Sequence, residues 1–556
     1  MAVVPPLSMT PWILLSLLFA NSAFSLPNVT LSGGIKVVGR SFDAVNQEVF
    51  RGIPYAEPPV ASLRFKPPVP KHNFASSTIN ATAFGASCLQ PAAEILNLEK
   101  LSEDCLTVNV QRPSGLSSSA KLPVMVWIHG GSFHSGAGAD SRINATNLVS
   151  QSVARGTPII YVNFNYRLGP LGFPVGPEAE RHGALNLGLK DQLLAIKWIN
   201  QNIGFFGGDK SKVTLYGQSA GSMSVASLMV NPGLKNLVRA AILESGVGFV
   251  AMPCGGTCKQ AETGWNNFVR QLPECQGSTI NTLACVRDKA SEASLLKAIL
   301  ATSSWYDPVV IFSPVVDGPG GFLPAQPSQL FAQGKHVRIP VISGTNLDEG
   351  TSFAPSETNS TKSIVDWMKT LFRPTRALDR ALPGLLERYP DIPALGSPHN
   401  TGNETFGLSS QFKRLSSILG DVVFAAPHRA LNQKLTEQGV DVYGYLFSDR
   451  GVQTEQWPYL GVSHSYDLPY VYGNAHANAT SSSRVLTTQM VDYWISFATS
   501  LKPNDGRGSQ RPAWPKYGRR KPSILELNGE GIRTITDNFR AKGIDYITSH
   551  SEAFHG

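Results

Sequence analysis

The 556-residue chain has few charged residues and no evident internal boundary. Charged side chains make up 16% of the sequence, the formal net charge is +8, and no Lys/Arg cluster with interleaved aromatic residues stands out. This distribution argues against a nucleic-acid-binding protein. The sequence also lacks a linker or an internal repeat. With 42% hydrophobic residues, it predicts one large globular domain over residues 26–556.

The N-terminus lacks the length of a membrane anchor and also lacks a basic leading segment. Its apolar run, Trp12–Ala20, is shorter than the about twenty residues that a transmembrane helix needs. The small-residue pattern that ends at Ser25 is typical of a cleavage site. We therefore predict a signal peptide over residues 1–25 and a secreted, extracellular protein without a stable membrane anchor.

Asparagines in N-x-S/T context fit secretion, because N-linked glycans are added to exported chains. Each acceptor must also be exposed. The predicted glycosylation sites are Asn28, Asn80, Asn144, Asn359, Asn403 and Asn478.

Cysteine is scarce, and the spacing of the six residues does not fix which of them pair. Cys254 and Cys258 are close enough in sequence to bridge each other. The same C-x-x-x-C spacing is also found in metal sites, but no histidine lies near it. We predict no metal site and no cofactor.

The most informative motif is Gly217-Gln218-Ser219-Ala220-Gly221. The alternating residues 212–216 before it predict a strand, and the apolar spacing of residues 222–230 predicts a helix. A G-x-S-x-G serine on such a strand-to-helix turn is a nucleophile in many hydrolases, although the bare pattern also arises by chance in a chain with 51 glycines. Ser219 is therefore the candidate nucleophile.

A serine nucleophile needs a histidine to accept its proton and a carboxylate to orient that histidine. In this class of sites the chain order is Ser, acid, His. His464, on a Gly/Ser-rich loop, is the preferred base, because catalytic side chains concentrate on such loops. The sequence around His428 predicts a helix, in which this side chain packs or is solvated. The histidines far enough downstream are His399, His428, His464, His476, His550 and His555.

The acid is expected after the buried strand predicted over residues 339–344. The loop that follows carries Asp348 and Glu349 at the carboxyl end, where α/β sheets build their sites. Either residue fits. Asp317 is a third candidate for the acid, although it could instead be a turn residue at the end of a strand.

The oxyanion formed by attack on an ester requires backbone N–H groups that already point at it. One donor is expected from Ala220. The others are expected from the glycine-rich turn His129-Gly130-Gly131-Ser132, which follows a predicted strand over residues 122–128.

With these parts in place, the chain resembles the type-B carboxylesterase/lipase family, the cholinesterase-like branch of the α/β-hydrolases. The resemblance covers nearly all of the mature chain. It rests on residues 50–59 (FRGIPYAEPP), residues 63–65 (LRF), residues 102–110 (SEDCLTVNV), residues 165–169 (NYRLG) and residues 190–192 (KDQ). It implies an α/β-hydrolase fold, with a large, mostly parallel central sheet and helices on both faces.

The resemblance implies Ser219 as the nucleophile, Glu349 as the acid with Asp348 beside it, and His464 as the general base. The implied oxyanion donors are the amides of Gly131, Ser132 and Ala220. The resemblance further implies that Ser245 stands behind the triad. By the same analogy, the implied buried ion pairs are Arg64–Glu103 and Arg167–Asp191, and the implied disulfides are Cys88–Cys105 and Cys275–Cys285.

Two positions depart from the family pattern. Gln218 replaces the usual acidic residue before the nucleophile, which removes a negative charge from the site. Ser132 replaces the third glycine of the oxyanion turn. No tryptophan lies between Cys88 and Cys105, where cholinesterases place the aromatic residue that binds choline. The missing negative charge and the missing tryptophan argue against choline esters, whereas Ser132 has no assigned role.

The loop of residues 88–105 corresponds to the lid of the fungal lipases in the family, and it is short here. We therefore expect an esterase for short-chain, medium-chain or aryl esters such as feruloyl esters, with Phe133 and Phe353 as candidates to line an acyl pocket. The alternative is a lipase or sterol esterase that acts on long-chain lipid esters at an interface. A remote alternative is a non-catalytic binding protein of the same fold. The sequence leaves the oligomeric state undetermined.

Overall fold

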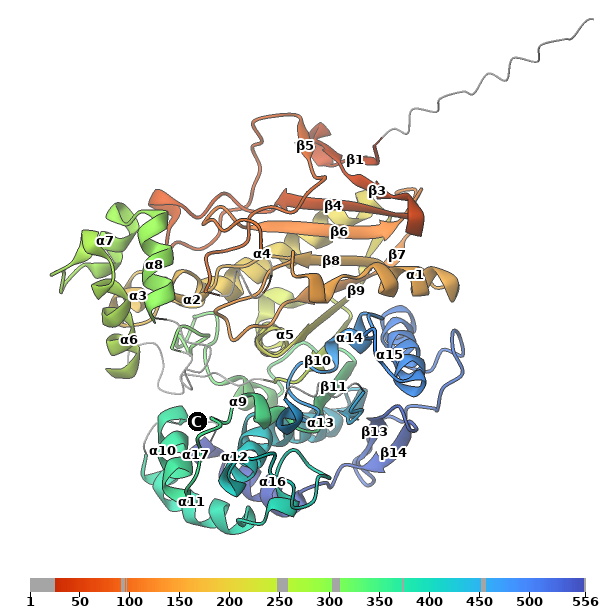
Figure 1. Ribbon diagram of the computed structural model, residues 1–556. Helices are drawn as coiled ribbons and strands as arrows, with labels where there is room; N and C mark the ends of the chain where they lie inside the picture. The colour runs from red at the N-terminus through yellow and green to blue at the C-terminus, as the bar shows by residue number, and fades with distance from the viewer. Residues whose placement is uncertain are drawn as a thin grey trace, which may run out of the picture.

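The computed structural model describes residues 26–91, 96, 98–247, 259–302, 311–372, 375–451 and 457–554 (Figure 1). The predicted signal peptide, Cys254 and Cys258 lie outside the described residues.

One eleven-stranded sheet runs through the molecule in the order β14-β13-β12-β11-β10-β9-β7-β8-β6-β4-β3. The strands from β8 to β13 in this order pair in parallel, whereas β14, β6, β4 and β3 pair antiparallel at the two edges. Their bounds are β3 (Arg40–Phe42), β4 (Gln47–Pro54), β6 (Thr107–Pro113), β7 (Leu122–Ile128), β8 (Ile160–Phe164), β9 (Gly208–Gln218), β10 (Ala240–Glu244), β11 (Val341–Asn346), β12 (Val442–Phe447), β13 (Ser523–Leu527) and β14 (Arg533–Thr536). A separate three-stranded sheet contains β1 (Asn28–Thr30), β2 (Lys36–Val38) and β5 (Thr78–Asn80).

Helices connect the parallel strands and cover both faces of the sheet, as the α/β expectation requires. Their bounds are α1 (Thr146–Ala154), α2 (Gly169–Gly172), α3 (Pro177–Arg181), α4 (Leu187–Asn202), α5 (Ala220–Met229), α6 (Lys259–Arg270), α7 (Thr282–Lys289), α8 (Glu292–Thr302), α9 (Pro327–Ala332), α10 (Thr361–Leu371), α11 (Arg376–Arg388), α12 (Ser410–Leu419), α13 (Ala426–Glu437), α14 (Leu468–Val471), α15 (Ser481–Ser500), α16 (Ala541–Ser549) and α17 (Ser551–Phe554). Among the described residues, none of these helices is both long and apolar enough to cross a membrane.

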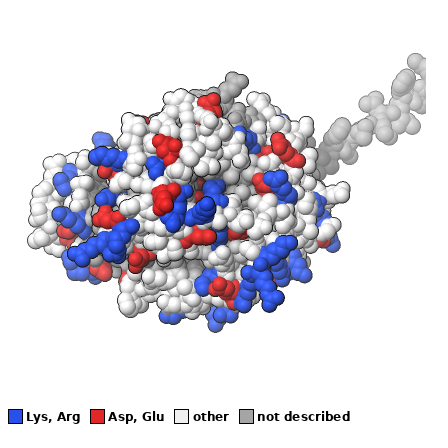
Figure 2. Space-filling view, turned by 90° about the horizontal axis from the view of Figure 1, so that it is seen from below, with Lys and Arg blue, Asp and Glu red and all other residues white. Residues whose placement is uncertain are grey.

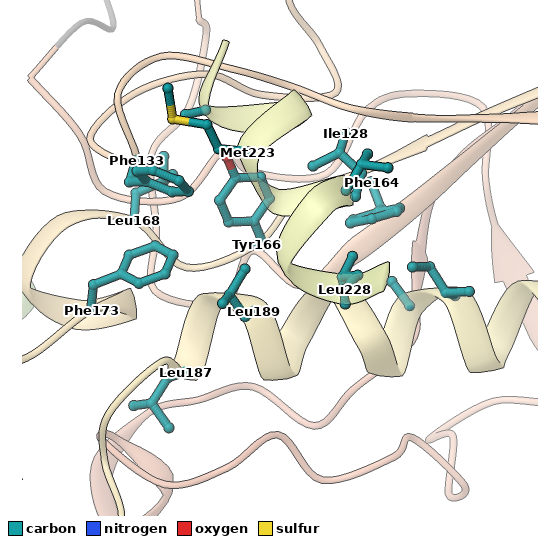
Figure 3. Packing of buried hydrophobic residues seen from close by; sticks show 14 of the residues in the cluster. Ile128, Phe133, Phe164, Tyr166, Leu168, Phe173, Leu187, Leu189, Met223 and Leu228 are labelled. Carbon is teal, nitrogen blue, oxygen red and sulfur yellow. The ribbon is translucent and has the colours of Figure 1, made fainter. Parts of the chain in front are cut away.

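Two hydrophobic cores form because successive side chains of a strand point to opposite faces of the sheet. In β7, Val124 and Val126 join the core that contains α4 and α5, whereas Met125 and Trp127 join the core that contains α15. Figure 3 shows the first core, in which Leu228 of α5 and Leu189 of α4 turn toward each other. Burial on both faces explains why residues 122–128 are continuously apolar.

A third core belongs to a group of helices at the bottom of Figure 1. It is built by α10, α11, α12, α16 and α17 together with a π-helical turn over Gly420–Ala425. This helical lobe follows the acid loop in the sequence and also receives the last two helices of the chain. It therefore joins chain segments that are far apart.

Candidate active site

Ser219 is the single residue between β9 and α5, and its backbone conformation is unfavourable for residues that carry a side chain. Its φ of 58° and ψ of −129° lie outside the ordinary strand and helix regions. A Cβ on Gly221 would come within 2.1 Å of the carbonyl oxygen of Ile128, and one on Gly217 within 2.7 Å of the same oxygen. Both glycines are needed because β7, β9 and α5 pass this close to one another.

The glycine-rich turn after β7 lies directly against Ser219. A Cβ built on Gly130 would come within 3.0 Å of the Ser219 Cβ. Gly131 and Ser132 have positive φ values of 102° and 53°, and the turn closes by hydrogen bonds from the amides of residues 134 and 135 to the Gly131 carbonyl. The amides of Gly131, Ser132 and Ala220 make no hydrogen bond with any described residue. They are available to an anion beside the serine.

His464 and Glu349 are in direct contact. The imidazole Nδ1 lies 2.5 Å from Glu349 Oε2, with only 9% and 2% of the two side chains exposed. The other carboxylate oxygen accepts the backbone N–H of Asn346 at 2.7 Å. The rings of Phe353 and Phe424 flank the imidazole, with centroids 5.1 and 4.8 Å away. The two phenyl rings also stack on each other, with centroids 5.6 Å apart, so the imidazole is held at Nδ1 and packs against a pair of aromatic rings.

The second imidazole nitrogen contacts Gln218. With Nδ1 donating to the carboxylate, Nε2 carries the lone pair, and the amide nitrogen of Gln218 lies 3.2 Å from it. The Ser219 hydroxyl makes no hydrogen bond with a described residue, as is common in substrate-free sites. Gln218 is 3% exposed. A neutral amide thus occupies the side of the imidazole that faces the nucleophile strand.

Of the two acids that the sequence left open, Glu349 contacts the imidazole and Asp348 does not. Asp348 accepts hydrogen bonds from the Ser397 hydroxyl at 2.8 Å and from the amides of His399 at 2.7 Å and Val462 at 3.0 Å. Burial raises its pKa. Asp348 therefore anchors the segment that precedes His464.

The other sequence candidates lie apart from the triad geometry. Asp317 accepts the amides of Phe322 and Leu323, so it closes a turn. His428 is buried in α13, where its Nε2 accepts the Gly246 amide at 2.8 Å, and burial lowers its pKa to about 3. Ser245 is fully buried next to Gly246, whose Cβ would meet the Ser219 carbonyl oxygen at 2.7 Å.

Behind Glu349 lies a group of polar residues that sequence reasoning missed. The Asn346 amide donates to the Ser463 carbonyl at 2.8 Å and to Asp467 Oδ1 at 3.2 Å, so it ties the acid loop to the histidine loop. Burial, followed by the nearby Glu349, raises the pKa of Asp467 to about 6. In the sequence, the only indication that Asp467 belongs to the site was its position three residues after His464. Among the described residues, no group of His, Cys, Asp and Glu is arranged to hold a metal ion.

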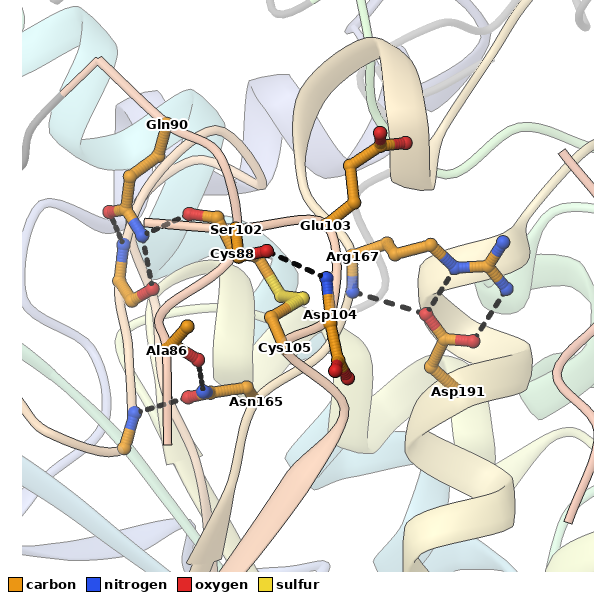
Figure 4. Close-up of a disulfide and its surroundings, with 12 residues drawn as sticks. Ala86, Cys88, Gln90, Ser102, Glu103, Asp104, Cys105, Asn165, Arg167 and Asp191 are labelled. Atoms are coloured by element: carbon orange, nitrogen blue, oxygen red, sulfur yellow. Dashed lines mark hydrogen bonds and ion pairs between the residues drawn. A yellow bond between two sulfur atoms is a disulfide. The ribbon is translucent and has the colours of Figure 1, made fainter. Parts of the chain in front are cut away.

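The loop of residues 88–105 is fastened to the segment that follows the oxyanion turn (Figure 4). The Cys88–Cys105 disulfide closes it. Gln90 donates to the Gly136 carbonyl and accepts the Gly136 amide, at 3.0 and 2.8 Å. At its base, the Ser87 amide donates to the Lys100 carbonyl at 2.9 Å. The apolar Leu89 and Leu96 are buried rather than exposed on the loop surface.

The structure contains the cross-links that the family resemblance implied. Cys275 pairs with Cys285. Arg167 binds both carboxylate oxygens of Asp191 at 2.7 and 2.8 Å (Figure 4). Arg64 binds both oxygens of Glu103 at 2.6 and 2.7 Å. All four charged side chains of these two pairs are buried.

The two phenylalanines expected at an acyl pocket differ in their surroundings. Phe133 is 3% exposed and packs edge-on against Phe173 within the core. Phe353 is 37% exposed and contacts the ring of His464. Only Phe353 therefore presents apolar surface to a molecule that approaches the imidazole.

Comparison with known proteins places this site in a family. The model of the carboxylesterase family matches residues 25–546. The chain is 35% identical to Lipase 4 of Diutina rugosa, over 96% of this chain and 98% of that protein. It is 34% identical to the secreted triacylglycerol lipase LIP1 of Gibberella zeae, over 93% and 89% of the two chains.

Solved structures are similar over almost the same length. The crystal structure of Aspergillus niger EstA matches with a TM-score of 0.80 and 26% identity, over 96% of this chain and 99% of that one. A PNB esterase matches with a TM-score of 0.74 and 30% identity, over 93% and 99%. The chain therefore belongs to the carboxylesterase family, has its α/β-hydrolase fold and is a carboxylic ester hydrolase.

Proposed function

We propose that the enzyme hydrolyses esters through a covalent acyl-enzyme formed on Ser219. In this proposal the serine oxygen attacks the ester carbonyl while His464 Nε2 takes the hydroxyl proton, and Glu349 stabilises the resulting imidazolium. The imidazolium then gives the proton to the departing alkoxide. A water molecule, deprotonated by the same imidazole, releases the acid and restores the serine. The proposed oxyanion donors are the amides of Gly131, Ser132 and Ala220.

The contact between His464 Nδ1 and Glu349 Oε2 supports this mechanism most directly. It leaves Nε2 without a proton, so that this nitrogen can accept one from the serine hydroxyl. The unbonded amides beside the serine support the proposed oxyanion site. The strained serine backbone adds support, because such strain gathers at functional positions.

For the substrate, we propose soluble short-chain, medium-chain or aryl esters. The described residues of the 88–105 loop support soluble substrates, because the hydrogen bonds of Gln90 and the Ser87–Lys100 hydrogen bond fasten the loop to its surroundings. A loop held in this way opposes the large lid movement that interfacial activation requires. Feruloyl esters belong to the proposed range.

The second candidate is a lipase for long-chain lipid esters. The names of the relatives favour it, since the proteins from Diutina rugosa and Gibberella zeae are called lipases. Under this alternative the protein also contacts a lipid interface. The chemistry at Ser219 is the same in both candidates.

The test is hydrolysis of p-nitrophenyl esters from acetate to palmitate, together with methyl ferulate and a tributyrin emulsion, by the protein and its Ser219→Ala variant. We expect a short-chain or aryl optimum, no jump in rate above the solubility limit of tributyrin, and loss of turnover in the variant at an unchanged melting temperature. A long-chain optimum with such a jump favours the lipase. Turnover that survives in the folded variant refutes the mechanism.

A further inference from the structure

Basic side chains from three separate segments meet around the C-terminal end of α13. Arg519 donates to the carbonyls of Thr436 and Glu437, and Arg338 donates to the carbonyl of Gln438 at 3.5 Å. Lys516 pairs with Asp441 at 2.7 Å. We call this surface the basic edge. It comprises Lys335, Arg338, Lys434, Lys516, Arg519, Arg520 and Lys521, with the acids Glu437 and Asp441.

The basic edge holds most of the net charge of the chain. Its seven cations and two acids give +5, against +8 for all 556 residues. Lys434 and Lys516 pair with the two acids. The five remaining cations are exposed and form no ion pair with a described acid, namely Lys335, Arg338, Arg519, Arg520 and Lys521. Arg338 and Arg519 already donate to carbonyls at the C-terminal end of α13, and the net charge of the surface remains positive.

Surface charge elsewhere is more mixed. Figure 2 shows one face of the molecule, on which several groups of Lys and Arg lie beside Asp and Glu and between wide uncharged areas. The exposed cations of α10 give an example, since Lys362 pairs with Asp366 and Lys369 with Asp379. The cations of α10 therefore differ from five cations of the basic edge in having acid partners.

The basic edge and the candidate active site lie at opposite ends of the strands β11 and β12. Arg338 precedes β11 and residues 438–441 precede β12, at the amino ends of these strands. Glu349 and His464 follow their carboxyl ends. Since the two strands are parallel, the two sites are separated by about 20 Å along the strands. A partner bound to the basic edge leaves the active site uncovered.

We propose that the basic edge binds an acidic polysaccharide, with the active site facing away from it. Carboxylates repeated along such a chain match flexible lysines and the planar fork of arginine. Single-stranded nucleic acid fits less well, because it needs aromatic stacking and Tyr517, the aromatic residue between Lys516 and Arg519, is 4% exposed. A membrane bound there would lie on the wrong side for ester hydrolysis at its surface. The proposal goes beyond the ester hydrolysis and assumes the predicted secretion.

The experiment measures retention on polygalacturonate beads at about 0.01 M and about 0.15 M ionic strength, where the Debye length falls from about 30 to about 8 Å. It compares the full-length protein with Arg519→Ser/Arg520→Ser/Lys521→Ser. The control is Lys362→Ser/Arg376→Ser/Arg380→Ser, which removes three exposed cations of α10 and α11. Both variants have the same net charge. Vesicles containing phosphatidylserine and single-stranded DNA serve as competing probes.

We expect salt-sensitive retention that falls roughly tenfold or more in the first variant and stays within about twofold in the control. All three proteins should hydrolyse a soluble p-nitrophenyl ester at the same rate, which shows that they are folded. An equal loss in the control, no loss in either variant, or stronger retention by the vesicles or the DNA would overturn the proposal.

Discussion

Gln218 places a neutral amide against the nitrogen that must accept the serine proton. Its amide nitrogen lies 3.2 Å from His464 Nε2. An amide nitrogen at this position is placed to donate to the Nε2 lone pair. A carboxylate at the same position would instead attract the imidazolium. The identity of this one residue therefore affects the protonation of the proposed base.

The first prediction is that Gln218→Glu moves the acidic limb of the pH profile of kcat/KM to higher pH, by on the order of one unit or more. The new negative charge favours the protonated imidazole, which is inactive as a base. The profile is measured with a soluble p-nitrophenyl ester between pH 4 and 9. The control is Gln218→Met, which has similar length and no charge. The prediction is wrong if the acidic limb of the kcat/KM profile lies at the same pH in Gln218→Glu and in the wild type.

A second residue-scale prediction concerns Asp467, whose pKa burial raises to about 6. In an unfolded chain the same carboxyl has a pKa of about 4, so its neutral form stabilises the folded state below pH ~4 and this contribution is lost as the pH rises through about 6. Asp467→Asn removes that dependence. As the pH rises from about 4 to about 6, we expect the free energy of unfolding of the variant to increase relative to that of the wild type, by on the order of 3 kcal/mol.

Melting temperatures of both proteins across this pH range provide the measurement. In the variant the Asn346 amide, which donates to Asp467 Oδ1, keeps an oxygen partner, and the Tyr445 hydroxyl, which contacts Oδ2, can accept a hydrogen bond from the new amide nitrogen. Parallel stability curves for the two proteins would show that Asp467 ionises normally in the fold.

At the scale of elements, Arg64 joins a loop to the end of a helix. Besides the two bonds to Glu103, its guanidinium donates to the carbonyls of Val286, Arg287 and Ala290 at the C-terminal end of α7. The Val286 carbonyl also accepts the Ala290 amide, and the guanidinium cation matches the negative end of the helix dipole. Glu103 lies within the loop of residues 88–105. One side chain thus holds two elements that are about 180 residues apart in the sequence.

The third prediction is that Arg64→Met lowers the free energy of unfolding by about 3–5 kcal/mol, because Glu103 is then left charged and buried. Urea unfolding followed by tryptophan fluorescence measures the loss. The double variant Arg64→Met/Glu103→Leu should recover part of it, since no unpaired charge remains. A double variant that is less stable than the single one would mean that the α7 carbonyls, rather than Glu103, account for the loss.

Several elements were predictable because their signals are local. The strand expected over residues 122–128 is β7 with the same bounds, and the helix expected over residues 222–230 is α5, which begins two residues earlier. The strand expected over residues 339–344 is β11, shifted by two residues. Alternation, apolar runs and glycine positions act between neighbours in the chain, so a sequence reports them directly.

At the scale of the whole molecule, the acceptor asparagines meet the condition of exposure that N-linked glycosylation requires. All six are exposed, namely Asn28, Asn80, Asn144, Asn359, Asn403 and Asn478. We propose that they carry N-linked glycans in the secreted protein. A buried asparagine could not serve as an acceptor.

The fourth prediction is that protein secreted from a eukaryotic host begins at Leu26 and loses mass on treatment with peptide-N-glycosidase. N-terminal sequencing and intact-mass measurement test both statements, and replacement of each asparagine by glutamine shows which sites are used. A mature chain that still contains residues 1–25, or a mass unaffected by the enzyme, would contradict the predicted export and glycosylation.

Local patterns in the sequence predicted the strands β7, β9 and β11 and the turn that carries Ser219, because these features depend on neighbouring residues. The sequence left Asp348 and Glu349 as equal candidates, since two adjacent side chains in one loop have the same local signal. Only the tertiary structure placed Glu349 at His464 and Asp348 at the next loop. It also brought Gln218 to the imidazole and gathered the basic edge from three segments. These contacts depend on the order of the strands in the sheet, which is set by the packing of the whole chain.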